Sequence, residues 1–137
     1  MPTKKHIPSR NRSPYGWWIY QEVEQWVSNR QKAIGPNSRC LIWENVRIIQ
    51  AKDREQAYKK AMKLGKQGRP SKTDQGEWRF LGLSWLYPIH DEMEDGAELL
   101  WKDRGPMRMK EAMKRVRNKE QLAVFDDQDD PARQRAS

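Results

Sequence analysis

The chain has 137 residues, of which 34% are charged, and it carries a net charge of +8 and a mean hydropathy of −1.13. Its length allows one domain with tails, and no stretch approaches the roughly 20 consecutive apolar residues of a membrane-spanning helix, so we expect no membrane partner. Its single cysteine, Cys40, excludes an internal disulfide and a metal site built from several cysteines, which favours a protein of the reducing cytoplasm.

Residues 1–16 are rich in proline, serine and basic side chains and show no hydrophobic period, so we expect a disordered basic arm. The arm has a net charge of +4, from Lys4, Lys5, Arg10 and Arg12. These cations are candidates for binding a nucleic acid or another anion, because basic side chains neutralise phosphates without reading a sequence. A solubilising tail would have the same composition.

Residues 17–103 are expected to form the core domain, and their net charge is only +1. The segment 17–27 alternates aromatic and β-branched residues with polar ones, and the segment 40–51 does the same. A period of two with this composition predicts strands. The turn-forming residues between them favour an antiparallel hairpin.

Residues 53–65 are predicted to form a helix that Asp53 caps and whose apolar stripe contains Ala57 and Ala61. Its solvated side carries the candidate anion-binding residues Lys59 and Lys63. A third strand is predicted over 76–87, where Gly82 indicates a bulge or the close approach of another backbone, and a short fourth strand over 97–101. The predicted fold class is therefore α+β, with a four-stranded, mainly antiparallel sheet in ββαββ order covered by one helix.

Residues 104–125 are predicted to form a basic amphipathic helix, over about 107–119, followed by an apolar docking segment, and residues 126–137 a disordered tail. Met109 and Met113 lie on the apolar stripe and are candidate partner-binding residues, since methionine suits adaptable contacts. The candidate nucleic-acid-binding residues of the polar side are Arg108, Lys110, Lys114, Arg115 and Arg117.

The core resembles a small bacterial family known only as a domain of unknown function, number 4288. The resemblance rests on Trp17-Trp18, on the segments 43–51 and 78–83, on the helix residues Asp53, Glu55, Ala57 and Ala61, and on 95–98. It covers residues 17–102 and implies a domain of sheet and helix with no known catalytic residues. The basic arm and the residues after Arg104 lie outside it.

No constellation of residues favours catalysis, a metal or a cofactor, and we predict none of them. A nucleophile needs an adjacent base, and Cys40 lies in an apolar strand with His90 as the only histidine outside the arm. The segment 90–95 lacks the spacing of a calcium loop. Glu22, Glu24 and Glu44 could face one another as a carboxylate pair, although exposed strand faces carry glutamate routinely.

Aromatic and basic residues alternate on the predicted strands, where Trp43 and Trp85 are candidate partner-binding residues. Together with Arg47, Trp78 and Arg79 they could present one face that stacks unpaired bases, whereas core packing of the tryptophans is the favoured interpretation. The function expected from these features is a non-catalytic module that binds a protein or serves as an accessory subunit. The alternatives are an RNA- or DNA-binding protein that uses the basic arms and, last, a small enzyme. The sequence does not define the oligomeric state.

Overall fold

The computed structural model describes residues 6–30, 33–68, 72–73 and 75–128, with only the backbone for 72–73. The chain divides into two compact units between Trp101 and Lys102, and each unit is described by itself. Lys4, Lys5 and part of the predicted tail, 129–137, lie outside the described residues.

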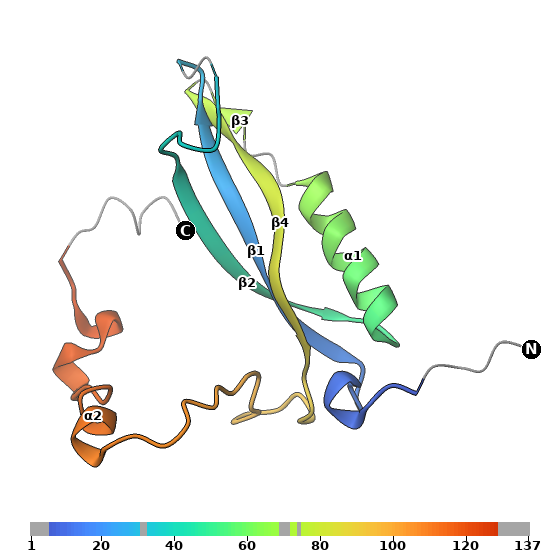
Figure 1. Ribbon diagram of the computed structural model, residues 1–137, viewed down its shortest axis with the longest axis vertical. Helices are drawn as coiled ribbons and strands as arrows, with labels where there is room; N and C mark the ends of the chain where they lie inside the picture. The colour runs from blue at the N-terminus through green and yellow to red at the C-terminus, as the bar shows by residue number, and fades with distance from the viewer. Residues whose placement is uncertain (1–5, 31–32, 69–71, 74, 129–137) are drawn as a thin grey trace, which may run out of the picture. The chain divides into compact units, whose positions relative to one another are not determined.

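The first unit is built on three long antiparallel strands, β1 (Trp17–Ser28), β2 (Leu41–Gln50) and β4 (Gly76–Pro88). A two-residue strand, β3 (Lys72–Thr73), pairs with the start of β4. The strand order is β2-β1-β4-β3, so β1 lies between β2 and β4 and β2 forms one edge (Figure 1). The predicted hairpin of the first two strands and the third long strand are present.

Helix α1 (Arg54–Gln67) lies along one face of this sheet (Figure 1). The Oδ1 atom of Asp53 accepts a hydrogen bond of 2.8 Å from the backbone N–H of Gln56, which confirms the predicted cap. Gly68, with φ 64°, ends the helix in a conformation that favours glycine. Ala57 and Ala61 are fully buried, and their small side chains let α1 approach the sheet closely.

The core lies between α1 and the sheet and is small. Trp18, Tyr20 and Ile49 contribute its larger side chains, and Ala51, Ala57 and Ala61 complete the buried cluster. Leu83 and Leu86 of β4 pack against this cluster and are partly buried. A domain this short holds its fold with few large apolar residues, so each of them carries a large share of the stability.

Two predicted elements differ from the structure of this unit. Residues 97–101 form no strand. The predicted ββαββ order, which placed two full strands after the helix, is not confirmed, because α1 is followed by the two-residue β3 and then by one long strand, β4. A strand forms where its backbone finds a partner, and the alternation of five residues does not specify one. The mixed α and β content is as predicted.

The register of β4 changes at two places, on either side of Gly82. The shifts lie opposite Gln21/Glu22 and Val23/Glu24, so Gly82 stands between two irregularities of the ladder with φ 150°. The predicted bulge in this strand is therefore present.

The N-terminal segment, for which the sequence predicts disorder, contains a 3₁₀ helix at Ser9–Asn11. The Ser13 hydroxyl donates a hydrogen bond of 2.9 Å to the carbonyl oxygen of Ile89 and accepts one of 3.0 Å from the N–H of Trp17. These contacts tie the segment to the end of β4. They involve backbone atoms far away in the sequence, which composition cannot reveal.

The second unit contains α2 (Met109–Met113) and two 3₁₀ turns, Lys119–Gln121 and Ala123–Phe125. The predicted helix over 107–119 is therefore too long. Lys110 and Lys114 lie four residues apart, where like charges destabilise a helix, and a helix of this length is marginal by itself. Asn118 and Gln121 then exchange side-chain to backbone hydrogen bonds of 3.1 Å and begin a new turn.

Candidate interaction surface

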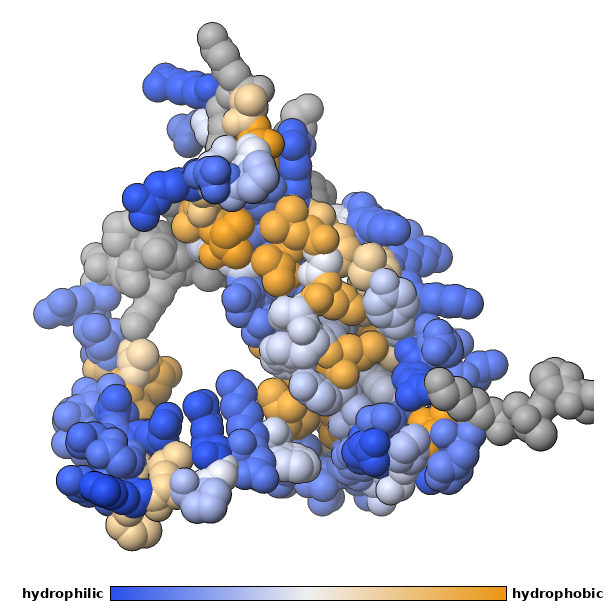
Figure 2. Space-filling model, in the orientation of Figure 1, coloured by the Kyte–Doolittle hydropathy of each residue, from blue (hydrophilic) through white to orange (hydrophobic). Residues whose placement is uncertain are grey.

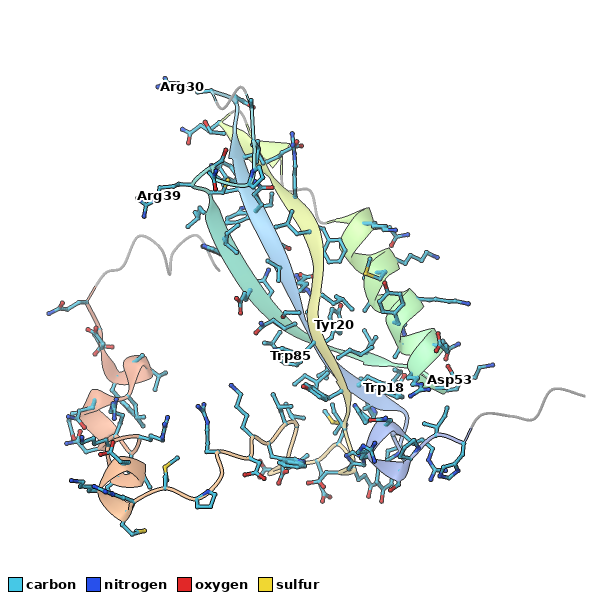
Figure 3. All side chains as sticks on the ribbon, in the orientation of Figure 1. Trp18, Tyr20, Arg30, Arg39, Asp53 and Trp85 are labelled. Carbon is cyan, nitrogen blue, oxygen red and sulfur yellow. The ribbon has the colours of Figure 1, made fainter. Side chains whose placement is uncertain are left out.

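The two faces of the sheet differ in what covers them. The pairing of Tyr20 with Arg47 and Leu86 places the even-numbered residues of β1 on the side of the core and of α1. The odd-numbered residues point to the opposite side, where Gln21 pairs with Val46 and Trp85. Tyr20 and Trp85 accordingly extend to opposite sides of the sheet in Figure 3. No helix of the described part of the first unit packs on this second side, which we call the open face.

The open face exposes large apolar side chains. On β2 these are Ile42, Val46 and Ile48, which are 45%, 54% and 41% exposed, and on β4 Tyr87 is 49% exposed. Trp85 is half-buried and its ring contacts that of Tyr87, with the centroids 5.7 Å apart. Figure 2 shows apolar side chains gathered along the sheet between hydrophilic surroundings. Several large apolar side chains exposed on one face of a small domain indicate an interaction site.

Polar groups at the middle of the open face are fixed in position. The Nε2 of Gln21 donates hydrogen bonds to the Oε2 of Glu44, at 2.6 Å, and to the Oγ of Ser84, at 2.8 Å. This set links all three long strands. The apolar residues of β2 therefore stand on a surface whose centre is held by hydrogen bonds, and a partner would meet a preformed shape.

The edge of β2 adjoins the open face. In the described sheet β2 pairs with β1 on one side only, so its other side presents free backbone donors and acceptors. Its ten residues contain no proline and no lysine, the residues that commonly protect an edge strand. Edge and face together form one continuous surface that a partner strand or apolar surface can approach.

The covered face holds a buried ion pair. Arg47 Nε donates to Glu22 Oε1 at 2.7 Å, and the side chains of Glu22 and Arg47 are 4% and 29% exposed. Burial, and then the negative charge of Glu22, raise the pKa of Glu24. Burial is also the main cause of the raised pKa of Tyr20, whose buried hydroxyl has no hydrogen-bond partner among the described residues. The covered face therefore carries charged side chains that are paired with one another inside the fold.

Of the three glutamates that could form a carboxylate pair, Glu22 and Glu24 lie together on the covered face, where burial and then the charge of Glu22 raise the pKa of Glu24. Glu44 lies on the open face with Val23 as its neighbour on β1. The proposed platform of aromatic and arginine residues is also divided. Trp43, Arg47 and Trp78 are on the covered face, while Arg79 and Trp85 are on the open face. The hypothesis that one face presents all five residues is wrong, because each alternating strand sends its side chains to both sides.

Three tryptophans of the covered face contact one another. The ring of Trp78 lies 5.4 Å from that of Trp26 and 4.8 Å from that of Trp43, centroid to centroid, in tilted arrangements that favour aromatic pairs. All three are half-buried. Trp43, predicted to bind a partner, is thus part of an aromatic cluster of the fold, and Trp85 is the predicted residue that lies on the open face.

The predicted basic residues are distributed over three segments. Arg10 and Arg12 lie in the N-terminal segment, and Lys59 and Lys63 are exposed on α1. The basic residues of the second unit, with Met109 and Met113, are exposed there as well; they are Arg108, Lys110, Lys114, Arg115 and Arg117. The first two groups belong to the first unit and the third to the second unit.

Cys40 and His90 lie at opposite ends of the sheet. Cys40 precedes β2 and its sulfur accepts a hydrogen bond of 3.1 Å from Gln25 Nε2, whereas His90 follows β4 and its Nε2 is 3.1 Å from the carbonyl oxygen of Ser9. Across the described residues, no three histidine, cysteine or acidic side chains form a group that could hold a metal ion. Among the described helices, none has the length and apolar character needed to cross a membrane.

Four residues of the open face were not among the binding residues predicted from the sequence: Ile42, Val46, Ile48 and Tyr87. The alternation within 40–51 already places the first three on one side of a strand. Which side α1 covers depends on the packing of the whole unit, and a pattern with apolar residues on both sides does not decide it.

Residues 17–101 match the sequence model of a family described as "Domain of unknown function (DUF4288)". No curated protein and no solved structure matches the chain. The match begins at β1 and ends at the last residue of the first unit. The N-terminal segment and the second unit lie outside it.

Proposed function

Because the chain belongs to the DUF4288 family, whose description assigns no activity, we propose from the structure that it is a non-catalytic module that binds a protein partner on the open face of its sheet. The observation that carries this proposal is the exposure of Ile42, Val46, Ile48 and Tyr87 on a face that α1 leaves uncovered. Burying an apolar side chain of this size contributes about 1.5–3 kcal/mol when it is fully removed from water.

The kind of partner follows from the chemistry of the face. The exposed side chains are aliphatic and aromatic, and the polar groups between them already bond to one another through Gln21. A partner with a complementary apolar surface, or an extended segment that also pairs with the edge of β2, would satisfy both parts of the surface. We therefore place the partner's contact along β2.

A non-catalytic role is proposed because the candidate chemical groups are engaged within the fold. The carboxylate of Glu22 binds Arg47, and Cys40 and His90 have separate partners at opposite ends of the sheet. Nucleic-acid binding receives less support, because a stacking platform needs several aromatic and basic residues side by side, and the five candidates are divided between the two faces of the sheet.

The test compares two variants of the full chain with the same change of charge. Val46→Lys alters the centre of the exposed row on β2, and Leu64→Lys alters another exposed apolar residue, on α1. Each tagged chain is recovered from its host cells with nuclease and at about 0.5 M salt, where exposed charge interactions are screened. The bound protein is identified by mass spectrometry, purified and titrated back by calorimetry.

We expect the wild type and Leu64→Lys to bind the partner alike and Val46→Lys to bind at least tenfold more weakly, since about 1.4 kcal/mol corresponds to a factor of ten. The change in heat capacity on binding should be negative, because binding buries apolar surface. Equal binding by all three chains would overturn the proposal, and so would binding that nuclease or salt abolishes.

A further inference from the structure

A cavity of about 410 Å³ lies between the N-terminal segment and the start of α1, well away from the exposed row on β2. Figure 3 shows Trp18 and Asp53, which both line it, close together at this end of the sheet. Its apolar lining comes from Ile7, Pro14 and Trp18, and its basic lining from Arg12, Lys52 and Arg54. Pockets for small molecules have volumes of about 300–1,000 Å³ and combine an apolar wall with a few placed polar groups.

The walls of this cavity are held by contacts between distant parts of the chain. On the side of the N-terminal segment, Ser13 bonds to the carbonyl oxygen of Ile89, and the carbonyl oxygen of Ser9 contacts His90. On the side of the sheet, the Nε1 of Trp18 donates a hydrogen bond of 3.0 Å to the carbonyl oxygen of Ala51 and fixes the indole ring. The cavity is therefore a built feature of the fold.

The charge of the lining is unbalanced. No ion pair among the described residues involves Arg12, Lys52 or Arg54. The acidic residue of the lining, Asp53, already accepts the N–H of Gln56 as the cap of α1. Three basic and one acidic side chain give the lining a net charge of +2. Charges of one sign in a concave site attract counter-ions of the opposite sign.

A second cavity, of about 360 Å³, continues the first. The two share Asn11, Trp18 and Arg54, and the second extends between α1 and the end of β4, where Tyr58 and Leu86 line it. Its lining also includes the acidic Glu55, so the excess of basic side chains is confined to the first cavity. A ligand with an anionic head and a small apolar body would therefore be held in the first cavity.

We infer that the first cavity binds a small organic phosphate, with its dianionic head between Arg12, Lys52 and Arg54 and its apolar or aromatic body against Trp18, Ile7 and Pro14. A phosphate monoester carries a charge of about −1.5 to −2 at neutral pH, which matches the net charge of the lining. Guanidinium groups are suited to phosphate because their donors form a planar fork. One wall, formed by residues 7–14, lies outside the residues that match the family.

The experiment titrates the ¹⁵N-labelled full chain with phenyl phosphate and with three probes that each lack one of its features: benzoate, phenol and inorganic phosphate. The readouts are the indole N–H resonance of Trp18 and the backbone amide resonance of Arg54. We expect saturable shifts of both with phenyl phosphate and weaker binding of each other probe. Benzoate and phenol lose charge from the head, and each charge contact at a partly exposed site contributes up to about fivefold, whereas inorganic phosphate loses the burial of the ring.

Three single substitutions locate the site. Arg54→Gln and Arg12→Gln each remove one of the three cations and should weaken the binding of phenyl phosphate about fivefold. Lys59→Gln removes the same charge from α1 at a residue that lines neither cavity and should leave the affinity unchanged. Arg12 is exposed, so its substitution tests the site even if Arg54→Gln disturbs the start of α1.

Three results would overturn the inference. These are the absence of shifts with phenyl phosphate at about 10 mM, equal binding of phenol, benzoate or inorganic phosphate, and an equal loss of affinity in Lys59→Gln. The binding of a protein to the open face does not enter these measurements, so the two proposals can fail separately.

Discussion

The packing of α1 against β4 makes a definite prediction for Gly65, in the last turn of the helix. An alanine at a helical glycine normally stabilises a protein by about 1 kcal/mol. Here the side chain of Phe80 leaves no room for it, because a Cβ atom built on Gly65 would meet the ring, with the ring's Cδ1 at 2.6 Å. Either the ring or the helix must shift.

The magnitude follows from two opposing terms. Overpacking of a well-packed site costs about 1–3 kcal/mol, and the gain in helix propensity offsets up to about 1 kcal/mol of it. We therefore expect Gly65→Ala to lower the free energy of unfolding by about 1 kcal/mol. For a unit of this size the melting temperature would fall by about 4–8 °C.

The assay is urea denaturation of the full chain, followed by tryptophan fluorescence, with Phe80→Leu as the second arm of a double-mutant cycle. Leucine removes the ring that the new Cβ would meet. In the Phe80→Leu background, Gly65→Ala should therefore be neutral or stabilising by up to about 1 kcal/mol. If Gly65→Ala stabilises the wild type, or has the same effect in both backgrounds, the described contact does not limit the approach of α1.

Three further substitutions test the cap, the buried ion pair and the raised pKa, each in full-chain unfolding experiments. Asp53→Ala removes the N-cap of α1 and should lower the free energy of unfolding by about 1 kcal/mol. Asp53→Asn keeps a side-chain oxygen that can cap the helix and should retain most of the stability. Arg47→Met leaves the buried carboxylate of Glu22 without its partner and should cost about 2 kcal/mol, against less than about 0.5 kcal/mol for Arg79→Met at an exposed pair. The pKa of Glu24 is raised above its ordinary value of 4.5, so its ionisation destabilises the folded state, and stability falls as the pH rises through the folded pKa. Glu24→Gln should remove this part of the pH dependence and make the variant the more stable chain at pH 7; a difference between the two chains that stays constant from acid to neutral pH would contradict the assignment.

Much of the local structure could be predicted because its causes are local. The alternation of residues in the three long strands, the cap at Asp53 and the buried positions of Ala57 and Ala61 depend on neighbours a few residues away. The helix at the C-terminal end was predicted too long, since an apolar stripe does not reveal how far like charges and a new cap shorten a helix. The prediction of a fourth strand over 97–101 was wrong, because a strand also needs a partner strand with which to pair.

The candidate site was less predictable, for a related reason. A strand with apolar residues on both sides can bury either one, and α1 buries the side of Trp18 and Tyr20 while Ile42, Val46 and Ile48 stay exposed. The basic cavity joins Arg12 to Lys52 and Arg54, about forty residues away in the sequence, through backbone hydrogen bonds that no composition reveals.

The sequence by itself therefore determined the three long strands and the helix of the core, its family and the near neutrality of the core between basic ends. Only the tertiary structure decided which face of the sheet is open and which cations share a cavity. The physical reason is that periodicity and capping act within an element, whereas burial and the grouping of charges result from contacts between elements that are distant along the chain.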